Sequence, residues 1–176
     1  MADKPYQGSS EQRLVDLINS DNNTNLVLGV DYTFGELSEY SDAAGRNTQI
    51  VLLPLPPSGH KKEQTVFYRR LPIDVLADLP SEMVEAVPVN IPFTIHEVLP
   101  EINNKLGLAL TEEEVVDATY DTGHARYPLV ISAGSKAWLG GSSYAFEVVI
   151  VSGDQIPIEE KIATRALNGL NWPTAA

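Results

Sequence analysis

Hydrophobic residues recur at helical spacing in two segments of the chain. The first segment follows Ser9 and Gln12, which fit a capping box at the start of a helix. Its apolar positions form one stripe: Leu14, Val15, Leu17 and Ile18. The helix should end near residues 21–23, where Asp-Asn-Asn favours a turn.

The second helical segment lies near the middle of the chain. Thr94 and Glu97 fit a capping box. The apolar face consists of Ile95, Val98, Leu99, Ile102 and Leu106. Pro100 lacks an amide donor, so the helix should kink there or begin at that residue. Thr111 and Glu114 repeat the capping pattern and predict one more helix.

Runs rich in β-branched and aromatic residues predict three strands, at 26–34, 47–55 and 64–70. We expect them to form an antiparallel sheet on the first helix. The second strand should end at Pro54, because proline cannot donate to a β-ladder. Residues 127–132 and 145–151 should pair as a hairpin. The later strand is apolar on both faces and should lie centrally in its sheet.

The predicted fold class is α+β, with mostly antiparallel sheets packed against short capped helices and a C-terminal amphipathic segment. Residues 71–93 are rich in proline and indicate an ordered connector. The expected division is an N-terminal arm, a single α+β domain, and a C-terminal helix with its tail, at 1–8, 9–156 and 157–176. The connector would separate two sub-units of the domain, 9–70 and 94–151.

The two helical segments also resemble each other. A shift of 84 positions places Leu14 and Val15 on Val98 and Leu99, and it places residues 18–19, Ile-Asn, on residues 102–103. Leu26 falls on Leu110 in the same alignment. A divergent duplication would explain this pattern, and so would a chance match between two amphipathic helices.

Composition narrows the classes of function. Of the 176 residues, 24 are acidic and 12 are Lys or Arg, for a formal charge of -12, which disfavours binding to nucleic acid. The absence of cysteine excludes disulfides, thiol nucleophiles and cysteine-bearing zinc sites. A membrane span requires about 18 consecutive apolar residues, and no stretch of the sequence approaches this length. The first residues also lack the apolar region of a signal peptide. We therefore expect no membrane partner.

Motifs of catalysis are weak. Residues 121–123, Asp-Thr-Gly, match the aspartic-protease tripeptide, but their flanks are polar and no second copy supplies the partner carboxylate, which favours a turn. The acidic residues of 112–124 lack calcium-loop spacing, and His60, His96 and His124 form no metal-binding pair. The sequence therefore predicts no catalytic residue, no metal ligand and no cofactor. A carboxylate-based hydrolase is kept as an alternative.

Four segments carry a further signal: 13–19 with 21–26, 95–103 with 108–116, 127–129 with 136–140, and 167–173. They resemble small uncharacterised virion proteins of large tailed bacteriophages. The resemblance implies a non-enzymatic structural subunit of head, neck, tail or baseplate, assembled in the host cytoplasm and located in the virion. Its partners would be other virion proteins in a multi-copy homo- or hetero-oligomer. An alternative is a small acidic phage protein that binds a host partner as a regulatory or anti-defence module.

Aromatic residues near loops and termini are the candidate interface anchors, because large rings dominate interface energetics. They are Tyr6, Tyr40, Trp138 and Trp172. Two basic doublets, 61–62 and 69–70, flank one predicted strand. They are either solvated loop ends or contacts to an acidic patch on another subunit, which makes Arg69 and Arg70 further interface candidates.

Trp172 lies so close to the end of the chain that it either closes the domain or inserts into a neighbouring subunit. The variant Trp172→Ala tests whether this side chain inserts into a neighbouring subunit. The variant should assemble more weakly while the melting temperature of the monomer stays nearly unchanged, as measured by sedimentation and thermal denaturation. A large drop in monomer stability would assign Trp172 to the core.

Overall fold

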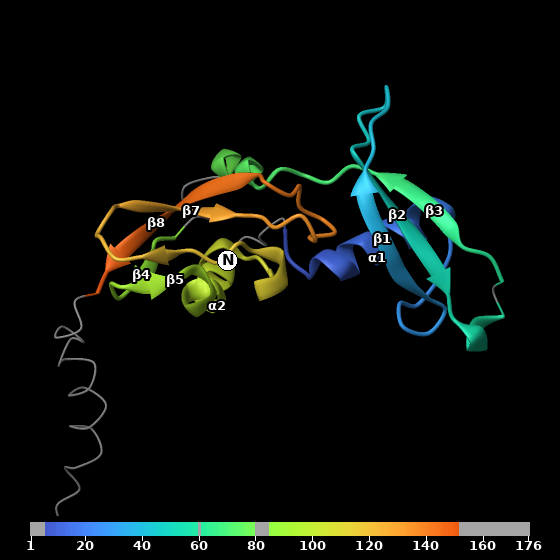
Figure 1. Cartoon of the computed structure of the whole chain (residues 1–176), viewed down its shortest axis with the longest axis horizontal. Coiled ribbons are helices and arrows are strands. Elements are labelled where there is room, and N and C mark those ends of the chain that lie inside the picture. Colours follow the sequence, from blue (N-terminus) through green and yellow to red (C-terminus); the bar gives the residue numbers. More distant parts are fainter. Residues whose placement is uncertain (1–5, 60, 80–84, 152–176) are drawn as a thin grey trace, which may run out of the picture.

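The structure is a computed structural model that describes residues 6–59, 61–79 and 85–151. Its buried side chains form two hydrophobic clusters, one from residues 14–68 and one from residues 73–146. The two clusters define two lobes that lie side by side along the long axis (Figure 1). The α+β class predicted from the sequence is confirmed. The predicted C-terminal segment, with Trp172, lies outside the described residues.

The first lobe is a three-stranded antiparallel sheet packed on one helix, as the sequence predicts. Its elements are α1 (Ser10–Asn22), β1 (Tyr32–Glu39), β2 (Thr48–Pro54) and β3 (Gln64–Tyr68), in the sheet order β1-β2-β3. The Ser9 hydroxyl accepts a hydrogen bond from Gln12 N, so the predicted cap is confirmed. The Gln12 side chain donates to Asp16 instead of completing the capping box.

The prediction of a strand from residue 26 is wrong. Residues 27–31 form a turn, in which Gly29 has a φ of 80° and the Asp31 carboxylate accepts from Val27 N at 2.8 Å. An Asp side chain that bonds the backbone in this way competes with strand pairing. The strand therefore begins at Tyr32, and the 26–31 loop is left to form part of the surface.

The second lobe holds a mixed sheet with the predicted hairpin. Its elements are α2 (Ile95–Leu106), β4 (Val87–Val89), β5 (Phe93–Thr94), β6 (Thr119–Tyr120), β7 (Arg126–Val130) and β8 (Ser143–Ile150). The order β4-β8-β7 confirms that β8 is central, and β4 pairs with it in parallel. Burial of β8 on both faces is not observed at its end, because Val149 is 56% exposed and Ile150 is 44% exposed.

Two expectations about the second lobe are wrong. The segment 71–93 is more than a connector, because a 3₁₀ helix at Ile73–Asp78 and strand β4 bury four side chains in the second core: Ile73, Leu76, Val87 and Val89. The predicted helix after Thr111 is only a 3₁₀ turn at Glu112–Glu114. It ends at once because Val116 N bonds to Val130 O beside the sheet.

Helix α2 begins at Ile95, so Pro100 is an interior residue and not the first helical one. The Thr94–Glu97 capping box forms with both of its hydrogen bonds. Because the capping box fixes the start of the helix at Ile95, the helix begins before Pro100 and not at it.

The sequence similarity between the two helical segments has a structural counterpart. The Asn19 side chain bonds both backbone groups of Leu26, donating to its carbonyl at 2.9 Å and accepting from its amide at 2.8 Å. Asn103 bonds Leu110 in the same way, at 2.8 and 3.0 Å. Both helices end at a residue with positive φ, Asn23 and Gly107, which also differ by 84 positions. The repeated geometry favours duplication over chance.

The lobes meet at the buried guanidinium of Arg70. Its Nε donates to Thr48 Oγ1 at 2.8 Å in the first lobe, and its Nη1 donates to the carbonyls of Ala133 and Ser135 at 3.0 Å in the second. Arg70 is 4% exposed, and burial lowers its pKa. It is buried and serves as a contact within the chain through its Nε and Nη1 donors, so the prediction that it meets another subunit is corrected.

We predict that Arg70→Met destabilises the protein by about 3 kcal/mol, because it leaves buried acceptors at the junction without a donor. The adjacent Arg69 is exposed. Arg69→Met should therefore change the free energy of unfolding by less than about 0.5 kcal/mol. Chemical denaturation of both variants measures the difference, and equal losses would contradict the role assigned to Arg70.

Candidate interaction site

The predicted anchor Trp138 is a core residue and not a surface residue. It is 2% exposed, Tyr6 packs against its ring edge-on at 5.5 Å, and the Arg13 guanidinium lies 5.0 Å from its centre. Its loop can close over the core because Gly140 passes next to the chain at Ala133, where an added Cβ would lie 2.7 Å from the Cα. Trp138 and Tyr6 therefore meet each other within the chain.

Tyr40 and Arg69 stay at the surface: Tyr40 lies on the outer face of the first lobe's sheet, and Arg69 is exposed just after the end of β3. Side chains alternate along β3, so Val66 and Tyr68 point toward α1 while Phe67 points outward. The Tyr40 ring packs on Phe67 with centroids 4.5 Å apart, and Phe67 is still 41% exposed. Tyr40 and Arg69 are therefore available for contacts with another protein, whereas Trp138 and Arg70 are buried.

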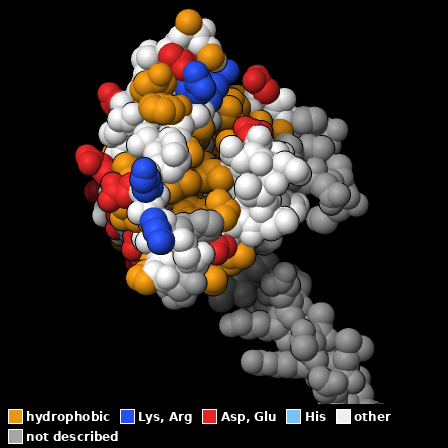
Figure 2. Space-filling view, turned by 90° about the vertical axis from the view of Figure 1, so that its right-hand side faces the viewer, with side chains coloured by type: hydrophobic (Ala, Val, Ile, Leu, Met, Phe, Trp, Pro, Cys, Tyr) orange, Lys and Arg blue, Asp and Glu red, His pale blue; other side chains and the backbone are white. Residues whose placement is uncertain are grey.

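A pocket that the sequence does not predict opens in the first lobe. It lies between the end of α1, the 24–31 loop and the sheet, and it encloses about 280 Å³. Figure 2 shows this end of the molecule, with hydrophobic side chains gathered at its centre and charged side chains around them. The apolar wall consists of Ile18, Leu26, Leu52, Pro54 and Val66.

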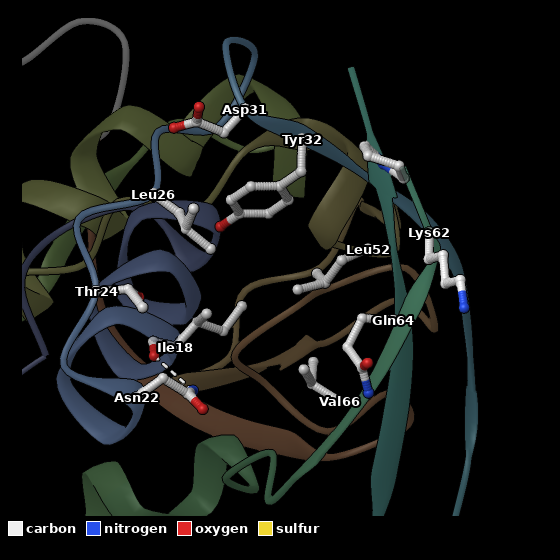
Figure 3. Close-up of a pocket in the computed structure, with 11 residues that line it drawn as sticks. Ile18, Asn22, Thr24, Leu26, Asp31, Tyr32, Leu52, Lys62, Gln64 and Val66 are labelled. Carbon is white, nitrogen blue, oxygen red and sulfur yellow. Dashed lines mark hydrogen bonds between the residues drawn. The ribbon is translucent and has the colours of Figure 1, made fainter. Parts of the chain in front are cut away.

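The hydroxyl of Tyr32 lies in this pocket without a hydrogen-bond partner. Tyr32 is 4% exposed, and in Figure 3 its ring enters the pocket with the hydroxyl directed toward Leu26. Burial, assisted by the charge of Asp31, raises the pKa of the Tyr32 hydroxyl, which keeps it protonated. An unpartnered buried hydroxyl costs about 1–3 kcal/mol, so a group that bonded it would gain affinity.

The rim of the pocket is polar but offers no catalytic arrangement. Asn22 donates to Ile18 O, and Asp31 holds the 26–31 loop through Val27 N. Lys62 and Gln64 extend from the other side in Figure 3. A single carboxylate with a single amine, above an apolar wall, suits binding of a mostly apolar group. The lining comes from separate segments, and for that reason no local motif reveals the pocket.

The other candidate chemistry has structural explanations. At 121–123, Tyr127 Oη donates to Thr122 O and accepts from His124 N, so the Asp-Thr-Gly tripeptide is part of a hydrogen-bonded turn. In the described part of the chain, no group of three or more His, Asp or Glu side chains is placed to hold a metal ion. None of the helices described in these ranges has the length and apolarity that a membrane span requires.

We predict that Tyr32→Phe raises the free energy of unfolding by about 1 kcal/mol, because it removes a buried hydroxyl that has no partner. The matched control is Tyr127→Phe, which removes a hydroxyl with two partners and should destabilise. Urea denaturation compares the two, and a loss of stability in Tyr32→Phe would mean that the hydroxyl is satisfied within the folded chain.

No curated protein matches the chain, and no solved structure matches it. Residues 3–176 match a family model described as "Family of unknown function (DUF7941)". Because this match spans both lobes and the pocket between α1 and the sheet, the chain belongs to the family of unknown function DUF7941.

Proposed function

We propose that the protein is a non-enzymatic structural subunit of a tailed-phage virion, and that the pocket at Tyr32 receives a side chain from a neighbouring virion protein. The observation that carries the proposal is the apolar pocket with an unpartnered hydroxyl inside it. Such a pocket is complementary to a largely hydrophobic group with one polar atom that can bond the hydroxyl.

A side chain suits the pocket better than a metabolite. The volume of the pocket, about 280 Å³, lies just below the range of about 300–1,000 Å³ that is typical of small-molecule sites. The surrounding surface is also apolar, because Val27 and Val30 on the loop that forms one wall are 51% and 57% exposed. An anchor residue in a pocket with apolar contacts around it is typical of protein interfaces.

The assignment to a virion rests on the resemblance of the four segments described above. Two residues of these segments have structural roles: Asn19 and Asn103 tie each helix to the following loop. Such ties maintain a shape, which is what a building block requires. The net charge of -12 is compatible with a role that does not contact DNA directly.

Mass spectrometry of purified phage particles tests the proposal. The protein should be present at a fixed stoichiometry relative to the major capsid protein and should remain after high-salt washing. Absence from particles, together with recovery of one host protein in a pull-down from infected cells, would replace the structural role with the host-binding alternative.

A second experiment tests the pocket itself. Gln64 lines the pocket and is exposed, so Gln64→Trp should cover its mouth without disturbing the core. We expect at least a tenfold loss of incorporation into particles, measured by complementation of a phage that lacks the gene. Glu63→Trp, at an exposed neighbour that does not line the pocket, is the control and should incorporate normally. Equal incorporation of both variants, with unchanged melting temperatures, would exclude the pocket as an interface.

A further inference from the structure

A second cavity of about 280 Å³ lies along the N-terminal half of α1, where the two lobes meet. It is lined by Arg13, Leu14, Leu17, Tyr68, Arg69, Leu71, Lys136 and Ala137. Three of these side chains are basic, although acidic residues outnumber basic ones two to one in the chain. The concentration of positive charge at one cavity points to a negatively charged ligand.

Arg13 is held in place and forms no ion pair within the described residues, although burial lowers its pKa and the charge of Glu114 partly opposes this effect. Its guanidinium lies 5.6 Å from the centre of the Tyr6 ring and 5.0 Å from that of Trp138, so two aromatic rings fix its position. Its Nη1 is buried and has no hydrogen-bond partner. A positioned guanidinium with an unused donor is the arrangement that binds carboxylates in proteins.

Tyr68 provides a second unused donor. It is 7% exposed and its hydroxyl has no hydrogen-bond partner. Burial raises its pKa to about 12, against the opposing effect of Arg70, so the hydroxyl keeps its proton at neutral pH. The cavity therefore has two buried polar groups, on α1 and on β3, that can donate and lack an acceptor.

The nearby carboxylates already have partners. Glu11 pairs with Lys136 at 3.0 Å, so this cation of the cavity has a carboxylate partner within the chain. Glu114 accepts from Ser135 Oγ at 2.6 Å. Asp16 accepts from the Gln12 side chain. Within the described residues, no carboxylate forms an ion pair with Arg13 or Arg69, so the chain itself leaves both cations available.

We propose that this cavity binds the carboxylate of a glutamate side chain presented by a partner protein. Arg13 and Tyr68 would donate to the carboxylate, and Arg69 would add positive charge at the rim, whereas Lys136 is paired with Glu11. Leu14, Leu17 and Leu71 supply apolar contacts for the methylene groups of the glutamate. The apolar lining favours a carboxylate on an aliphatic stem over phosphate, which is more strongly hydrated. The inference is independent of whether the partner is a virion protein.

Titration of the full chain tests the site. In a Trp172→Phe background, Trp138 is the single tryptophan and reports on Arg13, which packs against it. The probes are acetyl-Ala-Glu-Ala-amide, the matching Gln peptide, butyrate and inorganic phosphate. The Glu peptide should give a saturable change in fluorescence and should shift the Arg13 Hε resonance, and the Gln peptide should give neither. Butyrate should bind at least threefold more weakly than the Glu peptide.

Variants connect the signal to the cavity. Arg69→Gln and Tyr68→Phe should each weaken binding of the Glu peptide at least threefold. Tyr68→Phe should not lower the melting temperature, because the hydroxyl that it removes has no partner. Arg126→Gln, at an exposed cation that pairs with Glu147 outside the cavity, is the control and should bind normally.

Three results would overturn the proposal. One is an equal response to the Glu and Gln peptides, and another is binding that neither Arg69→Gln nor Tyr68→Phe weakens. Tighter binding of phosphate than of the Glu peptide would assign the cavity to phosphate instead. Equal binding of butyrate and the peptide would show that a free carboxylate is sufficient and would remove the protein partner.

Discussion

The Arg70 guanidinium, buried between the two lobes, is the contact on which their mutual placement depends. It donates to a threonine side chain in one lobe and to two backbone carbonyls in the other. Other contacts lie near it. The hydroxyls of Ser10 and Ser135 are within hydrogen-bond distance of each other, and the backbones of Leu71 and Trp138 form an isolated parallel β-bridge. A buried cation tolerates little displacement of its acceptors, so the lobes are held in one arrangement. The cavity at Arg13 and Lys136 lies at this junction, whereas the pocket at Tyr32 lies within the first lobe.

The cavities contrast in chemistry because they lie at different parts of the same helix. Near the end of α1 the helix faces only the sheet of its own lobe, and the pocket at Tyr32 is largely apolar. Along the first turns the helix faces the junction, where Arg13 and Lys136 come together from the two lobes. One element thus presents two surfaces that would recognise different features of a neighbour, which favours a defined orientation of the partner.

Local patterns predicted the parts of the fold that local interactions determine. Ser9 and Thr94 mark the two helix starts correctly, and Pro54 ends β2, since capping and a missing donor act within a few residues. Tertiary contacts determined the rest. From the sequence, Arg70 is one half of a basic doublet at a loop end, and only the folded second lobe supplies the acceptors that bury it. Trp138 is an aromatic residue in a loop, and only the folded chain shows that its side chain is buried. The two cavities follow from packing between distant segments, so no spacing along the chain could reveal them.

The paired amides of Asn19 and Asn103 have a consequence for the conditions that the fold can withstand. Each ties a helix to its loop through a neutral side chain that both donates and accepts. Neutral amides do not titrate and are not screened by dissolved ions, in contrast to surface ion pairs. Both helix–loop joints should therefore keep their geometry across wide ranges of acidity and ionic strength.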